Sequence, residues 1–145
     1  MVNRIIFFSI LIFSSYANAE YYMTLRNDKV NLRQGPSLQH PVKLIYKKKY
    51  LPVLITDKSY NFRKILDHEN NSGWIHISQL SKKKAALNTS NGSMIFKRPS
   101  KFSKPVATAG KGRLFLIKKC KEDWCKVKTG NFSGWIQKKY LKGRL

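Results

Sequence analysis

Apolar and polar residues alternate over short stretches along most of the chain, with the two-residue period of β-strands. Val30–Ser37 alternates up to Gly35-Pro36, where it should end in a turn because Pro cannot donate to a strand ladder. Two further apolar runs, His40–Tyr46 and Leu51–Thr56, are separated by the polar turn Lys47–Lys49. No helical period of useful length occurs, so the pattern predicts an all-β protein of short strands.

Further strands are predicted over Asn61–Leu66 and Gly73–His76, and a single 3₁₀ turn over Ile77–Leu80. The alternation in Asn61–Leu66 is imperfect, since Phe62 shares a face with Lys64. Glu20–Lys29 has no strong period, and we expect an extended lead there.

The chain repeats itself. Ser72-Gly73-Trp74-Ile75 returns as Ser133-Gly134-Trp135-Ile136, and a leucine follows each tryptophan by six residues, Leu80 and then Leu141. The other segments recur in the same order: Met94–Ser100 for Val30–Ser37, Gly112–Ile117 for Leu51–Thr56, and Trp124–Lys128 for Phe62–Leu66. Two copies of one small domain are therefore predicted, at residues 20–81 and 93–145, joined by a polar linker at 82–92.

Residues 1–19 have the features of an export signal: Arg4, a mostly apolar run Ile5–Phe13, and the small-residue pattern Ala17-Asn18-Ala19. We predict cleavage between Ala19 and Glu20. The apolar run falls well short of the ~20 residues that span a bilayer, so a membrane anchor is the weaker alternative. The prediction is a periplasmic or secreted protein that does not span the membrane after cleavage.

The chain is strongly basic, with 29 Lys and Arg against 7 Asp and Glu and a formal charge of +22. Such a charge attracts polyanions but carries no information about the fold. Lysine outnumbers arginine by 22 to 7, whereas nucleic-acid readers favour the planar fork of arginine. Specific nucleic-acid binding is therefore not expected. Anionic envelope polymers are possible partners, and drift in composition is an alternative cause of the charge.

The ordered motifs of the first copy resemble the bacterial SH3 domain family. The matching residues are Asn31, Leu32, Arg33, Gly35, Pro36, Ser37, Pro41, Val42, Phe62, Gly73, Trp74 and Leu80. In the second copy Phe96-Lys97 takes the place of the Leu-Arg pair and Gly35 has no counterpart, while Pro99, Ser100, Pro105, Val106, Trp124, Gly134, Trp135 and Leu141 remain. The chain is also similar to exported alphaproteobacterial proteins with two SH3-like copies, which have no defined activity.

This resemblance implies two tandem, small SH3-like β-barrels after a signal peptide. In related cell-wall hydrolases such modules hold the enzyme to peptidoglycan, although a fold alone does not fix a function. The resulting hypothesis is an exported, non-enzymatic protein that binds the cell wall, through peptidoglycan or another envelope component. The alternative is a module that recognises an extended segment of an envelope partner protein.

Cys120 and Cys125 are the only cysteines, and they bracket a four-residue hairpin loop. They should face each other across the first pair of a ladder in an oxidising compartment, so a disulfide is predicted. Two half-buried thiols are the alternative. A metal site is weaker still, because the spacing is not Cys-x-x-Cys and no histidine lies near.

Catalysis is not expected. His40, His68 and His76 all lie in the first copy, and no set of base, orienting residue and oxyanion donors is recognisable. No cofactor or metal is predicted.

The aromatic residues outnumber what two small cores can bury, so some should be exposed. We predict that Tyr50, Tyr60 and Trp74 line a shallow groove for an extended ligand, with Arg33 at its rim. An equally weighted alternative makes Trp74 and Trp135 core residues that close each barrel. The sequence further suggests that the first copy binds the ligand and the disulfide-stapled second copy supports it.

Overall fold

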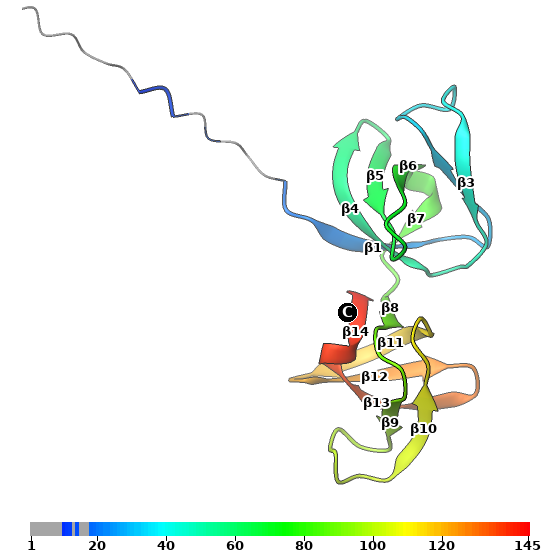
Figure 1. Ribbon diagram of the computed structural model, residues 1–145, viewed down its shortest axis with the longest axis vertical. Helices are drawn as coiled ribbons and strands as arrows, with labels where there is room; N and C mark the ends of the chain where they lie inside the picture. Colours follow the sequence, from blue (N-terminus) through cyan, green and yellow to red (C-terminus); the bar gives the residue numbers. More distant parts are fainter. Residues whose placement is uncertain (1–9, 13, 15–17) are drawn as a thin grey trace, which may run out of the picture.

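The structure is a computed structural model that describes residues 10–12, 14 and 18–145. Most of the predicted signal peptide lies outside these residues, so the signal peptide stays a prediction. Ala19 and Glu20 are exposed, immediately before the first strand. Within the described part of the chain, no helix is both long and apolar enough to cross a bilayer. Two β-domains follow one another along the long axis of the molecule (Figure 1).

Barrel 1 is a seven-stranded antiparallel sheet with the strand order β3-β2-β6-β5-β4-β1-β7. Its elements are β1 (Tyr21–Leu25), β2 (Val30–Arg33), β3 (Val42–Tyr46), β4 (Pro52–Ser59), β5 (Phe62–Leu66), β6 (Ser72–His76), the 3₁₀ turn η1 (Ile77–Gln79) and β7 (Leu80–Ser81).

Barrel 2 is a second seven-stranded sheet with the strand order β10-β9-β13-β12-β11-β8-β14. Its elements are β8 (Ala85–Asn88), β9 (Ser93–Phe96), β10 (Pro105–Ala109), β11 (Leu114–Lys121), β12 (Trp124–Thr129), β13 (Phe132–Gln137), the 3₁₀ turn η2 (Lys138–Tyr140) and β14 (Leu141–Arg144). The two sheets correspond strand for strand, which confirms the prediction of an all-β fold built from two copies.

The predicted linker is wrong at its centre. Residues 85–88 form strand β8, which pairs with β11 and β14 inside barrel 2. Ala85, Ala86, Leu87 and Asn88 are all buried, so this segment is a core strand of the second barrel. The predicted extended lead forms β1, which pairs with β4 and β7 and is the barrel 1 counterpart of β8. Without an alternating pattern, neither strand could be distinguished from a loop in the sequence.

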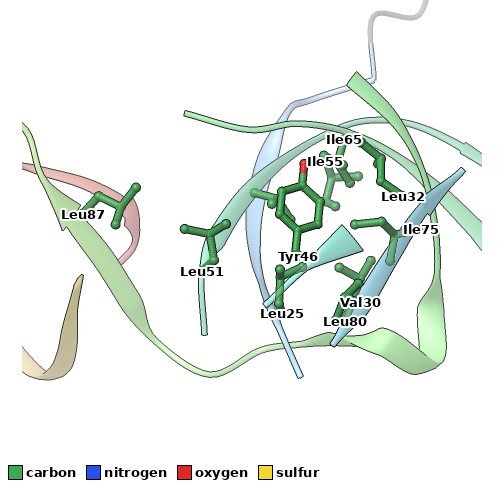
Figure 2. Packing of buried hydrophobic residues seen from close by; sticks show 11 residues of the cluster. Leu25, Val30, Leu32, Tyr46, Leu51, Ile55, Ile65, Ile75, Leu80 and Leu87 are labelled. Atoms are coloured by element: carbon green, nitrogen blue, oxygen red, sulfur yellow. The ribbon is translucent and has the colours of Figure 1, made fainter. Parts of the chain in front are cut away.

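Each barrel has an apolar core built from the inward side chains of its strands. In β2, Val30 and Leu32 are fully buried while Asn31 and Arg33 are partly exposed, as the two-residue period requires. The barrel 1 cluster also contains Leu87 from β8 of barrel 2. Figure 2 shows Leu87 beside Leu51, at the edge of the barrel 1 core. The two barrels therefore pack against each other through apolar side chains.

Hydrogen bonds reinforce this contact. Arg144, at the end of β14, donates from Nη1 to the Tyr22 carbonyl at 2.9 Å and from Nε to the Lys82 carbonyl at 3.0 Å. The last strand of the chain is thus tied to the first strand of barrel 1.

The repeated Ser-Gly-Trp-Ile sequence is explained by a close crossing of strands. A Cβ atom on Gly73 would lie 2.8 Å from the Arg33 carbonyl oxygen, and one on Gly134 would lie 2.6 Å from the Phe96 carbonyl oxygen. Only glycine allows β6 to approach β2, and β13 to approach β9, this closely. The isoleucine that follows is fully buried in both copies.

The register corrects one detail of the sequence comparison. Phe96 pairs with Trp135 as Arg33 pairs with Trp74, so Phe96 stands at the position of Arg33. Lys97 follows the strand and does not replace that arginine. The segment Ser93–Ser100 then matches Val30–Ser37 residue for residue. The match of Val30–Ser37 with the shorter Met94–Ser100 is therefore wrong, and Arg98 stands at the position of Gly35.

Candidate functional site

The four residues of the predicted groove lie on different parts of barrel 1. Arg33 and Trp74 are partners across β2 and β6, and both are partly buried. Tyr60 occupies the turn between β4 and β5 with φ 48°, and its side chain is 97% exposed. Tyr50 lies before β4, where its backbone N–H donates to the Leu25 carbonyl at 2.8 Å.

Leu51 and the eight residues of β4 lie between Tyr50 and Tyr60, and eight residues of straight strand span roughly 26 Å. The structure therefore brings Arg33 and Trp74 together and places the two tyrosines at opposite ends of β4. The groove formed by all four residues stays a prediction.

The loop after β2 is closed in barrel 1. The Arg33 guanidinium donates from Nη1 to the carbonyls of Leu38 and His40, at 3.1 and 3.0 Å. His40 also lies within hydrogen-bonding distance of the Ser37 hydroxyl, 2.7 Å from Nδ1 to Oγ. A Cβ atom on Gly35 would lie 2.4 Å from the His40 ring. The exposed His40 imidazole therefore packs against Gly35, where a larger residue would not fit.

The corresponding loop of barrel 2 borders an open hollow. Phe96 replaces Arg33 and makes an edge-to-face contact with Trp124, with ring centroids 5.7 Å apart. The side chain that ties down the first loop is thus exchanged for one that holds Trp124 in place. Phe102, in the loop between β9 and β10 of barrel 2, is fully exposed.

We call the resulting hollow of about 550 Å³ the Trp124 groove. Its walls combine two aromatic rings with three lysines, and the η2 wall is fixed because the Lys138 N–H donates to the Asp123 carbonyl at 2.7 Å. The lining residues are Pro99, Ser100, Lys101, Phe102, Asp123, Trp124, Gln137, Lys138 and Lys139. The sequence predicted that some aromatic side chains would be exposed, but it placed the groove in the first copy and not at Phe102 and Trp124. Nothing in the sequence indicated that the lysines would join them, because the lining residues come from three separate segments.

A second hollow of about 330 Å³ lies between the barrels. Tyr22, Leu54 and Leu66 line its barrel 1 side, and Lys111 and Lys142 its barrel 2 side. This cleft exists because β8 and β14 pack against barrel 1, so no single copy contains it.

The barrel 1 side of this cleft includes a buried carboxylate, Asp67. It accepts hydrogen bonds from the Tyr46 hydroxyl at 2.8 Å, from the Asn71 side-chain amide at 2.9 Å, and from the backbone N–H groups of Glu69 and Asn71. Burial by itself raises the pKa of Asp67. The hydrogen bonds together lower it by more, so the pKa lies below its ordinary value. Burial and the same hydrogen bond raise the pKa of Tyr46. This network explains Asp67 as a structural residue.

Cys120 and Cys125 form the predicted disulfide, but they are the second pair of the β11–β12 ladder. Lys121 and Trp124 pair nearer the turn, so the hairpin turn is Glu122-Asp123 and the predicted four-residue loop is wrong. Among the described residues, no group of three or more His, Cys, Asp or Glu side chains is placed to hold a metal ion. In the part of the chain that the structure describes, the one close contact between a basic and an acidic side chain joins His68 Nε2 and Glu69 Oε1, which lie 3.4 Å apart.

The positive charge is uneven between the barrels. Residues 85–145 carry 15 basic and 2 acidic side chains, whereas residues 20–81 carry 10 and 5. Polyanions are therefore attracted more strongly to barrel 2, the barrel that contains the Trp124 groove.

Comparison with known proteins gives one family. The family model described as "Bacterial SH3 domain" matches twice, at residues 26–82 and 89–143. A comparison with curated proteins finds no match.

Three solved structures are similar at low identity. They are NlpC2 from Trichomonas vaginalis (14% identity, TM-score 0.39), NlpC1 from the same organism (16%, 0.39) and an NlpC/P60 family protein from Bacillus cereus ATCC 10987 (13%, 0.38). The matches cover 88%, 94% and 83% of this chain, and 49%, 50% and 55% of those structures. The chain thus spans about half the length of the proteins that it resembles.

Proposed function

Because the chain belongs to the bacterial SH3 domain family, we propose that it is an exported, non-enzymatic protein that binds the cell wall, through peptidoglycan or another envelope component. The disulfide fits an oxidising compartment such as the periplasm or the exterior of the cell. The proposal places ligand binding in the Trp124 groove of barrel 2.

The observation that carries this proposal is the combination of exposed aromatic and cationic groups in one groove. Phe102 is fully exposed, although an isolated aromatic ring in water gains nothing for the fold. Trp124 is held by its contact with Phe96 and still lines the groove. Rigid aromatic rings beside mobile cations suit a ligand with flat apolar faces and negative groups, as envelope glycans and their peptides have.

A sedimentation assay with purified sacculi tests the proposal. The wild-type protein should pellet with sacculi at low salt, and a reduced but measurable fraction should pellet at 0.5 M salt. The charge contribution is screened there, since the Debye length falls below ~10 Å, while aromatic contacts persist. No retention at either salt concentration would rule out wall binding.

The alternative function is recognition of an extended segment of an envelope partner protein. It is favoured by β3, an edge strand of barrel 1 that is paired only with β2 and exposes Val42 and Ile45. An edge strand can accept another strand through its free backbone groups. Site-specific crosslinking from Val42 in intact cells distinguishes the two functions: this alternative predicts a discrete protein adduct, and wall binding through barrel 2 predicts none.

A further inference from the structure

The outer face of the β11–β12–β13 sheet carries a row of lysines directly beside the Trp124 groove. In β12, Trp124, Lys126 and Lys128 alternate with the buried Cys125, Val127 and Thr129, so the first three share the outer face.

Neighbouring strands extend this face. The register places Lys121 opposite Trp124 and Lys119 opposite Lys126. Trp135 of β13 is the partner of Lys126 on the other side, and the Lys119 ammonium lies 5.7 Å from the centroid of its ring. We call Lys119, Lys121, Lys126 and Lys128 the lysine face.

The pairing of Lys119 with Lys126 is unfavourable for the fold. Like charges directly opposite each other in an antiparallel ladder destabilise it, and opposite charges stabilise it by up to about 1 kcal/mol. The acidic residues of barrel 2, Glu122 and Asp123, both lie in the β11–β12 turn, at the end of this face.

Barrel 1 provides an internal comparison. Its equivalent row consists of Asp57 in β4, Lys64 in β5 and Trp74 in β6, with the same bulge before Asp57 that precedes Lys119. The same fold with the same tryptophan therefore accepts an acid opposite the lysine. Nothing in the architecture requires the second lysine of barrel 2.

The other lysines of the face show the same difference between the copies. The position of Lys121 is Ser59 in barrel 1, and the position of Lys128 is Leu66. Three of four positions are thus cationic in barrel 2 alone.

We propose that the lysine face and the Trp124 groove together bind a linear acidic polysaccharide. This inference rests on the proposed function and names its ligand class. Negative groups of the polymer pair with Lys119, Lys121 and Lys126, and sugar rings stack on Trp124 and Phe102. A bound polymer replaces the repulsion between Lys119 and Lys126 by attraction to both.

The chemistry favours this polymer over other polyanions. Adjacent strands place lysines about 4.8 Å apart and alternate residues of a strand about 6.6 Å apart, so the charges form an extended row. Lysine is a mobile point charge that suits irregularly spaced carboxylates or phosphates, whereas nucleic-acid readers rely on arginine, and residues 85–145 contain only Arg98, Arg113 and Arg144. The exposed aromatic rings would have no ring to stack on in a polymer without rings.

The first test is Lys119→Asp, which recreates the Asp57–Lys64 pair of barrel 1. Affinity for polygalacturonate should fall about tenfold at low salt, and less at 0.5 M salt, because a cation becomes an anion on the binding face. The melting temperature should not fall, because the cross-strand pair becomes attractive. Lys111→Asp is the matched control: it makes the same charge change on an exposed residue at the other end of β11, and its effect should stay below about twofold.

The second test is Phe102→Ala, which removes a fully exposed ring at no cost to the core. It should weaken binding of polygalacturonate about fivefold and leave binding of inorganic polyphosphate, a charged polymer without rings, unchanged. Neutral dextran should bind too weakly to measure.

Three results would overturn the inference: equal losses for Lys119→Asp and Lys111→Asp, equal losses for both polymers with Phe102→Ala, or stronger binding to anionic phospholipid vesicles or duplex DNA than to polygalacturonate at equal charge. The proposed function fails separately. If Lys119→Asp and Phe102→Ala leave retention on sacculi intact, wall binding stands, but this inference and the placement of binding in the Trp124 groove both fail. Binding of polygalacturonate without retention on sacculi would keep the acidic polysaccharide as ligand and rule out wall binding.

Discussion

The contact between the barrels predicts that a residue of barrel 2 stabilises barrel 1. Leu87 belongs to strand β8 of barrel 2 and is 6% exposed, yet it packs in the apolar cluster of barrel 1 beside Leu51. Leu87→Ala removes three buried carbons at a site bordered by the interbarrel cleft. Partial collapse into the cleft limits the cavity, so the expected loss is about 2–3 kcal/mol, at the low end of the range for buried leucines. That loss should lower the melting temperature by roughly 10 °C.

Hydrogen exchange followed by mass spectrometry locates the loss. In Leu87→Ala the amides of β1 and β4 in barrel 1 should exchange faster along with those of β8. Leu38→Ala is the control, because Leu38 is 64% exposed and its truncation should change stability by less than about 0.5 kcal/mol. If protection falls in barrel 2 while β1 and β4 keep wild-type protection, the barrels are energetically independent and the reasoning fails.

Three further changes test the packing. Asp67→Asn should cost about 2 kcal/mol at pH 7, because an acceptor of four hydrogen bonds becomes partly a donor. The folded-state pKa of Asp67 is lowered, so its contribution to stability is present above about pH 4 and is lost as the pH falls through that lowered pKa. The melting temperatures of the wild type and the Asp67→Asn variant should therefore approach each other as the pH is lowered below about 4, and a constant difference would contradict this. Reduction of Cys120–Cys125 should cost only about 2 kcal/mol, since the closed loop is short, and calorimetry with and without reductant measures it. Gly134→Ala should cost at least about 2 kcal/mol in denaturant titrations, because its Cβ would meet the Phe96 carbonyl oxygen at 2.6 Å; wild-type stability would show that the strands can move apart.

Most of the fold could be predicted because its signals are local. Alternation marked Val30–Arg33, the turn residues ended it, and the repeated Gly-Trp pair fixed the order of the second copy. The disulfide was predictable for the same reason, since both cysteines belong to one hairpin.

The parts that could not be predicted depend on contacts between distant segments. Strand β8 is buried because β11 and β14 flank it and barrel 1 covers Leu87, and its own residues do not alternate. The candidate site has the same origin. Arg33 hydrogen-bonds to the loop after β2, whereas Phe96 at the equivalent position contacts Trp124, but their equivalence appears only in the register with Trp74 and Trp135.

The sequence therefore directed attention to barrel 1 for binding, and the structure offers a groove in barrel 2. The two barrels can be compared directly because each has a fully or almost fully exposed aromatic side chain at a turn or loop. Tyr60 of barrel 1 is 97% exposed and Phe102 of barrel 2 is fully exposed. Truncating either ring leaves the cores intact, so a change in binding reports the binding surface itself.

The most direct test is a titration of purified sacculi with the wild-type protein, Phe102→Ala and Tyr60→Ala at one salt concentration. If the Trp124 groove binds the envelope, Phe102→Ala should weaken binding about fivefold and Tyr60→Ala should match the wild type. The opposite result, with Tyr60→Ala weakened and Phe102→Ala unchanged, would place binding in barrel 1 and contradict the account.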